Sequence, residues 1–132
     1  MSPDASPKRI LMVDDDQDIL LVISRRLQSW GYETLTVESG EAGLQLAQEQ
    51  PFDLILLDMM MPRMKGTDVC IQLKANPKTQ HIPVIFLSAL ADHIKEGLAL
   101  GAADYIVKPF RPEELKERIA LCLSRHGTPP TA

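Results

Sequence analysis

The sequence predicts one α/β domain with a flavodoxin-like (βα)5 fold: a doubly wound five-stranded parallel sheet in the order 2-1-3-4-5, with helices on both faces. Short apolar runs alternate strictly with longer amphipathic segments, and such alternation indicates a parallel sheet covered by helices. Most of the runs are continuously apolar, as strands buried on both sides are. Right-handed crossovers leave few topologies, and this order is a common one for five strands.

Each expected strand is a short apolar run that ends at a turn or a polar residue. The run RILMV is typical of a buried inner strand. The run YETLTV alternates between apolar and polar residues, as an edge strand can. We therefore expect strands at residues 9–13, 32–37, 52–57, 82–87 and 104–107.

The segment after the first strand predicts an amphipathic helix that ends at Gly31. We interpret Asp16 and Asp18 as capping and first-turn residues of this helix. Its apolar stripe is predicted to consist of Ile19, Ile23, Leu27 and Trp30.

Four further helices are expected between and after the remaining strands. Helices are predicted at about 40–49, in a short segment after Gly66, and at 92–100. Pro112 and the two glutamates behind it open the last helix, because proline and acidic residues favour a first turn. The apolar stripe of that helix is predicted to be Leu115, Ile119 and Leu123.

Composition limits the domain organisation and the kinds of partner. We expect a domain at 8–125 between an N-terminal tail at 1–7 and a tail or linker start at 126–132. A net charge of -4 without a basic patch argues against direct nucleic-acid binding by this domain. No apolar run is long enough for a membrane span, and the N-terminus lacks the apolar stretch of a signal peptide. Cys70 and Cys122 lack CxxC spacing, so we expect reduced thiols in a cytoplasmic protein.

Chemically active side chains follow several of the expected strands. In an open parallel sheet, the site lies beyond the carboxyl ends of the strands, at the switch point between strands one and three. Neighbouring strands are about 4.8 Å apart, so a residue after strand three can reach side chains that follow strands one and four. A residue after strand five is about 10 Å away and needs a long side chain. The residues delivered to this edge are Asp14, Asp15, Asp16, Asp58, Ser88 and Lys108.

The acidic residues at this edge require positive charge. Two carboxylates about 5 Å apart repel by roughly 3 kcal/mol at an effective dielectric constant near 20. Lys108 supplies only one positive charge, and a divalent cation would complete the balance. All candidate ligands are oxygens, which favours Mg²⁺ or Mn²⁺ over zinc. An oxygen nucleophile, a metal, a lysine and a hydroxyl together suggest phosphoryl chemistry.

The chain resembles the receiver domain of two-component response regulators, of the chemotaxis-receiver kind, over about residues 8–124. The motifs that carry the resemblance each follow the expected strand. They are VDDDQD (13–18), LILLDMMMPRMKG (54–66), VIFLSA (84–89) and GAADYIVKPF (101–110).

The resemblance implies a phosphoacceptor and a metal site. Asp58 matches the position that is phosphorylated in the family. Asp14 and Asp15 match the acidic pair that binds the metal, with Asp15 as the direct ligand and Asp14 acting mostly through water. The backbone carbonyl of Met60 matches a further metal ligand.

The resemblance also implies a switch. Ser88 matches the hydroxyl that hydrogen-bonds the phosphoryl group, and Lys108 matches the cation that pairs with it. Pro109 matches a position whose preceding peptide bond is usually cis in the family. Tyr105 matches an aromatic residue that turns inward as Ser88 moves, which changes the face formed by residues 92–107 and the last helix.

The expected function is a self-phosphorylating and self-dephosphorylating switch rather than a turnover enzyme. Asp58 takes a phosphoryl group from a sensor histidine kinase or phosphotransfer protein, and the effector or output domain is not encoded in the motifs. The resemblance is also compatible with a dimer that forms on phosphorylation. Two alternatives stay open at this point: a phosphorylation-independent interaction module, and a haloacid-dehalogenase-type phosphatase. Against the phosphatase, the late strands end in Ser88 and Lys108 rather than in an acidic pair.

Overall fold

The computed structural model describes residues 7–126 and contains a five-stranded parallel sheet in the order β2-β1-β3-β4-β5. The fold class and the strand order predicted from the sequence are both confirmed. Apart from Pro7 and the backbone of His126, the two predicted tails lie outside the described residues. The strands are β1 (Arg9–Val13), β2 (Glu33–Val37), β3 (Leu54–Leu57), β4 (Val84–Ser88) and β5 (Asp104–Val107).

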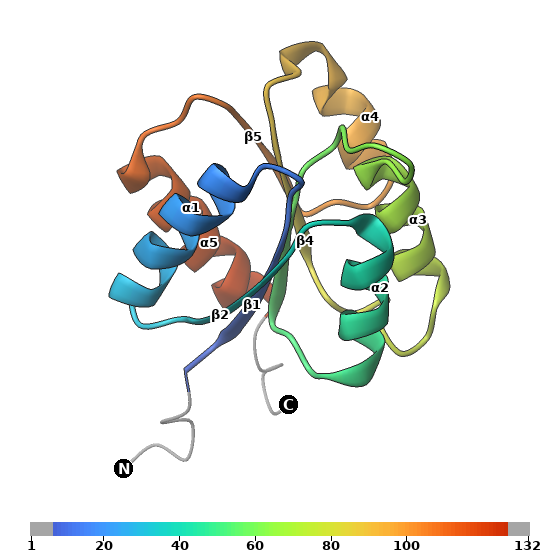
Figure 1. The fold of residues 1–132 in the computed structure, drawn as a ribbon, viewed down its shortest axis with the longest axis horizontal. Coiled ribbons are helices and arrows are strands. Elements are labelled where there is room, and N and C mark those ends of the chain that lie inside the picture. Colours follow the sequence, from blue (N-terminus) through green and yellow to red (C-terminus); the bar gives the residue numbers. More distant parts are fainter. Residues whose placement is uncertain (1–6, 127–132) are drawn as a thin grey trace.

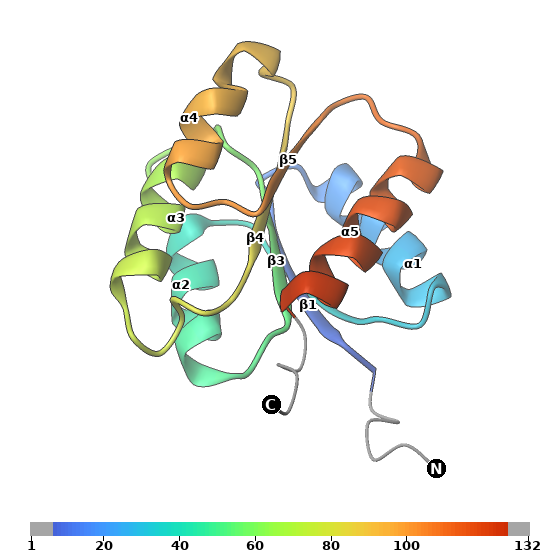
Figure 2. The same cartoon turned by 180° about the vertical axis from the view of Figure 1, so that it is seen from behind.

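Helices cover both faces of the sheet, as Figure 1 and the reverse view in Figure 2 show. One face carries α1 and α5, and the other carries α2, α3 and α4. Their bounds are α1 (Gln17–Ser29), α2 (Gly40–Glu49), α3 (Gly66–Ala75), α4 (Ile94–Ala99) and α5 (Pro112–His126). No helix in residues 7–126 is long and apolar enough to cross a membrane.

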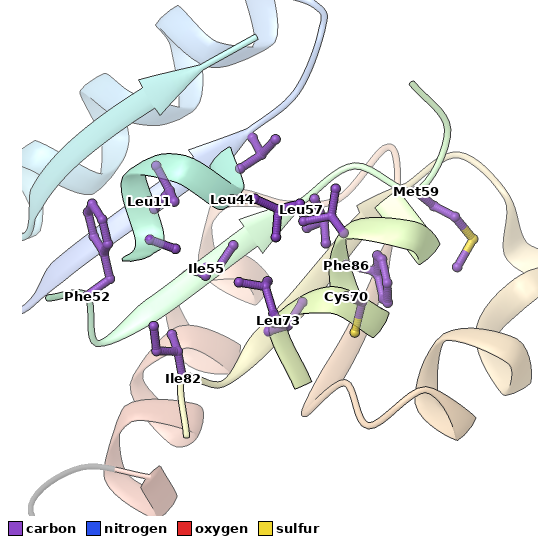
Figure 3. Packing of buried hydrophobic residues seen from close by; sticks show 14 of the residues in the cluster. Leu11, Leu44, Phe52, Ile55, Leu57, Met59, Cys70, Leu73, Ile82 and Phe86 are labelled. Atoms are coloured by element: carbon purple, nitrogen blue, oxygen red, sulfur yellow. The ribbon is translucent and has the colours of Figure 1, made fainter. Parts of the chain in front are cut away.

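Alternating side chains of the strands fill two hydrophobic cores, one on each face. In β1, Leu11 and Val13 face the core under α2 and α3, whereas Ile10 and Met12 face the core under α1 and α5. Figure 3 shows the first core, in which Leu44 of α2 and Leu73 of α3 lie over β1, β3 and β4. Because both faces are buried, continuous apolar strands are what this sheet requires.

The first and last helices begin as the sequence indicates. The Asp16 carboxylate accepts hydrogen bonds from the backbone N–H groups of Asp18 and Ile19, which caps α1. Gly31, which follows the end of α1, has a φ of +94°, a conformation that glycine adopts without steric cost. Helix α5 begins at Pro112 and buries its predicted stripe, Leu115, Ile119 and Leu123.

The predicted stripe of α1 is partly wrong. Its buried residues are Leu20, Ile23 and Leu27, whereas Ile19 and Trp30 at the ends of the predicted stripe are only half-buried. Spacings of three and four residues place the observed three on one face; Ile23 and Leu27 were predicted correctly, and Leu20 is buried in place of Ile19.

Other boundaries also differ from the predictions. The segment expected as a helix at 92–100 begins as a 3-10 turn (Ala91–His93) and continues as the short α4. Strands β3 and β4 begin two residues later than expected. Before β3, the Asp53 carboxylate accepts a hydrogen bond from the backbone of Arg9. Before β4, Pro83 has no N–H for the ladder, although its carbonyl accepts from Ile55.

Candidate metal centre

The register of β1 against β3 brings the three predicted acidic side chains together. Val13 and Leu57 are paired across the two strands, and the backbone N–H of Asp58 donates to the carbonyl of Val13 at 2.9 Å. One carboxylate oxygen from each of Asp14, Asp15 and Asp58 lies within 4.8 Å of the other two. The Asp14 and Asp58 residues are only 1% and 9% exposed, and Asp15 is exposed. The cluster therefore opens to solvent on the side of Asp15.

Lys108 reaches this cluster from β5 across two strands. Its backbone N–H donates to the carbonyl of Ser88 at 2.8 Å, which fixes the chain at the end of the sheet. Its Nζ lies 3.1 Å from Oδ2 of Asp14 and 3.9 Å from Oδ1 of Asp58. The Lys108-Pro109 peptide bond is cis. One ammonium group thus faces two of the three carboxylates, as the length of a lysine side chain allows.

The charge balance of the cluster is visible in the pKa of Asp58, which is raised from 3.8 to about 6. Burial is the largest cause, and the neighbouring charges of Asp14 and Asp15 raise the pKa further. The Lys108 ammonium and a backbone hydrogen bond at Met60 act in the opposite direction. Negative charge is therefore in excess. The donor set consists of carboxylate oxygens alone, which fits a hard divalent cation such as Mg²⁺.

The loop after Asp58 folds back over the end of β3. The backbone N–H of Gly66 donates to the carbonyl of Met59 at 2.8 Å. A Cβ atom at position 66 would lie 2.0 Å from the carbonyl oxygen of Asp58, so only glycine fits there. Met59 is buried beneath the loop, while the side chain of Met60 is 49% exposed. Sequence reasoning did not identify Gly66 as a positioning residue; its place at the start of a helix near the acidic residue was the available signal.

Ser88 and Tyr105 are joined through the backbone of one residue between β4 and α4. Ser88 is 1% exposed, and its Oγ accepts a hydrogen bond from the N–H of Leu90 at 3.1 Å. The Tyr105 hydroxyl donates to the carbonyl of Leu90 and lies 3.6 Å from Sδ of Met59. Tyr105 is 5% exposed, so its ring lies inward. The linking role of Leu90 could not be predicted from the sequence, because its backbone N–H and carbonyl are the same in any residue that could stand there.

The described cysteine and histidine side chains are not part of this cluster. Cys70 and Cys122 are buried in α3 and α5. His81 is exposed, and Nδ1 of His93 lies 2.7 Å from a carboxylate oxygen of Glu96. The side chain of the third histidine lies outside the described residues. In the part of the chain that the structure describes, the acidic cluster is the one group of three histidine, cysteine or carboxylate side chains close enough together to hold a metal ion.

Comparison with known proteins places this geometry in a family. Residues 10–120 match the response regulator receiver domain. A probable transcriptional regulator, ycf27, from Cyanophora paradoxa is 44% identical over 124 residues, which are 92% of this chain and 51% of that protein. The alkaline phosphatase synthesis transcriptional regulatory protein PhoP from Bacillus subtilis is 38% identical, over 89% of this chain and 49% of that protein. The chain thus spans about half the length of these relatives.

Solved structures give the same result. The chemotaxis protein CheY4 from Vibrio cholerae superposes with a TM-score of 0.83 at 32% identity, covering 89% of this chain and all of that one. The response regulator TrrA from Thermotoga maritima, in complex with Mg²⁺-BeF, superposes with a TM-score of 0.81 at 34% identity, covering 88% and 99%. Sequence, fold and strand-end acids agree, and the chain belongs to the response regulator receiver domain family.

Proposed function

We propose that Asp58 is the residue that accepts the phosphoryl group in this receiver domain. The observation that carries the proposal is the cluster itself: three carboxylates within 4.8 Å of one another, with the Lys108 ammonium 3.9 Å from Asp58. The donor is a phosphohistidine of a sensor histidine kinase or phosphotransfer protein. Asp14, Asp15, Asp58 and the carbonyl of Met60 would hold Mg²⁺, and Mn²⁺ would suit the same oxygens.

The residues of the chain supply the nucleophile and the charges around the transferring group. An Asp58 carboxylate oxygen attacks the phosphorus in line, and a new O–P bond forms as the P–N bond to the donor imidazole breaks. The electron pair of that bond goes to the imidazole nitrogen, which then takes a proton. When bound, Mg²⁺ neutralises charge on the carboxylates and on the phosphoryl oxygens. The Lys108 ammonium, which forms an ion pair with Asp14, lies close enough to Asp58 to contact a phosphoryl oxygen attached there.

The acyl phosphate is proposed to change the face formed by α4, β5 and α5. A phosphoryl group on Asp58 adds negative charge and acceptor oxygens, which draw the Ser88 hydroxyl and the Lys108 ammonium toward it. Ser88 is tied through the Leu90 backbone to Tyr105, so movement at the site is passed to that face. Hydrolysis of the acyl phosphate resets the switch. The chain thus acts on itself and does not turn over a separate substrate.

A mass measurement tests the assignment of Asp58. The chain is incubated with Mg²⁺ and acetyl phosphate, and its intact mass is recorded. We expect one added phosphoryl group, absent in Asp58→Asn and absent when the metal is chelated. Asp92→Asn, which removes an exposed carboxylate away from the cluster, is the matched control and should be phosphorylated normally. Addition of the group to Asp58→Asn at the wild-type rate would refute the assignment.

The setting of the domain is proposed from its relatives and its charge. Relatives about twice as long are named as transcriptional regulators, which supports an output domain of that kind in the parent protein. The acidic chain itself is expected to make no direct contact with nucleic acid and to act in the cytoplasm. Neither the phosphatase nor the phosphorylation-independent module is favoured by the family match.

A further inference from the structure

Helix α4 rests on the sheet through a glycine. Gly97 is the single buried residue among the six of α4, while Ile94 and Leu98 are exposed. A Cβ atom at position 97 would lie 2.9 Å from Cδ2 of Tyr105 and 3.0 Å from Cδ2 of Phe86. The rings of Phe86 and Tyr105 have their centroids 5.9 Å apart. The Tyr105 ring therefore fills space that any other residue at 97 would need.

The seated ring is connected to the phosphorylation site by two hydrogen bonds. The Tyr105 hydroxyl donates to the carbonyl of Leu90, and the N–H of Leu90 donates to Oγ of Ser88. All three residues are buried or partly buried, so these bonds are shielded from competing water. A ring displaced from Gly97 would carry its hydroxyl away from Leu90 and free the loop beside Ser88.

We propose that Gly97 sets the resting position of the switch. Because Gly97 has no side chain, the Tyr105 ring can lie inward, and its hydrogen bond to Leu90 then keeps the Leu90 loop beside Ser88. This inference deepens the proposed function and rests on it. A ligand that favours the inward state gains apparent affinity in proportion to the fraction of molecules already in that state. A side chain at 97 must then weaken the binding of a phosphoryl analogue at Asp58.

The test is Gly97→Ala, followed by fluorine NMR and calorimetry. The protein is labelled with 3-fluorotyrosine in a Tyr32→Phe background, so that Tyr105 alone reports, since the chain has two tyrosines. We expect the Tyr105 resonance to move toward the position of free tyrosine. We also expect the affinity for beryllofluoride with Mg²⁺ to fall by roughly three- to tenfold. Ala99→Gly, at an exposed position of α4, is the control for helix propensity and should leave both readouts unchanged.

A second variant separates contact with the ring from a general effect on the helix. In a Tyr105→Ala background the contact with the Tyr105 ring is removed, so Gly97→Ala should change the affinity for beryllofluoride by less than about twofold. The same loss of affinity in both backgrounds would overturn the proposal, as would an unmoved Tyr105 resonance in Gly97→Ala. If the wild-type chain bound no beryllofluoride, the proposed function would fail and the coupling with it. A wild-type chain that binds the analogue while Gly97→Ala binds it equally well refutes the role of Gly97 alone.

Discussion

Removing the charge of Asp58 should stabilise the metal-free protein. A pKa of about 6 in place of 3.8 means that folding disfavours the ionised form of the Asp58 carboxyl. That difference corresponds to about 3 kcal/mol above neutral pH, and screening by solvent at the open side of the cluster reduces it toward about 1–2 kcal/mol. Asp58→Asn keeps the size of the side chain and removes the charge, so its free energy of unfolding should be higher by about that amount.

The assay is urea unfolding at a pH of about 8 with the metal chelated, repeated down to about pH 4. The sign follows from the raised pKa. Below about 3.8 the carboxyl is protonated in both the folded and the unfolded state, and no penalty exists; above about 6 it is ionised in both, and the penalty is complete. The advantage of Asp58→Asn should therefore shrink as the pH falls through 6. With saturating Mg²⁺ the wild type should recover, because a cation that binds only the folded state stabilises it.

Two results would refute this reasoning. A variant no more stable than the wild type in chelator at pH about 8 would show that the folded state does not penalise the ionised form of Asp58. An advantage that stays constant down to about pH 4 would show that Asn acts by packing rather than by its lack of charge. Asp92→Asn, which removes a carboxylate outside the cluster, should show neither the stabilisation nor the pH dependence.

Three further variants test the site. Lys108→Met should raise the affinity for Mg²⁺ severalfold in calorimetry, because the ammonium 3.1 Å from Asp14 repels a cation; unchanged affinity would contradict this. Gly66→Ala should lower the free energy of unfolding by about 2 kcal/mol or more, because its Cβ would lie 2.0 Å from the Asp58 carbonyl oxygen. Stability within about 0.5 kcal/mol of the wild type would argue against that contact. Ser88→Ala leaves the N–H two residues later without its acceptor, which should cost about 1–3 kcal/mol in urea unfolding and slow phosphorylation by acetyl phosphate.

The sheet and the acids at its edge could be predicted because they depend on patterns that are local in sequence. A continuous apolar run indicates a buried parallel strand, and the residue after it is delivered to the carboxyl edge whatever the helices do. Asp14, Asp58, Ser88 and Lys108 were found in this way. The length of a lysine side chain and the spacing of strands were enough to predict that Lys108 spans two strands, and its Nζ is 3.9 Å from Asp58.

The contacts of the switch could not be predicted because they depend on how closely segments approach one another. Gly97 matters only because α4 packs directly against the Tyr105 ring, where a side chain at position 97 would collide with it. Leu90 takes part through its backbone carbonyl and not through its side chain. Gly66 is a similar case, since its importance comes from a carbonyl eight residues earlier in the chain. Residue type and periodicity do not predict how closely two segments of the folded chain approach each other.

The cluster of like charges predicts that stability and function oppose each other in this domain. Burial, together with the neighbouring carboxylates of Asp14 and Asp15, raises the pKa of Asp58 and should weaken the metal-free fold, and Lys108 compensates for only part of the charge. The same excess of negative charge is what attracts a divalent cation. A bound cation would lower the pKa of Asp58 and keep its carboxylate ionised, and so available as a nucleophile, at lower pH as well. A substitution that relieves the repulsion should therefore stabilise the fold and lose phosphorylation together, and that paired outcome is the signature of a functional carboxylate rather than a structural one.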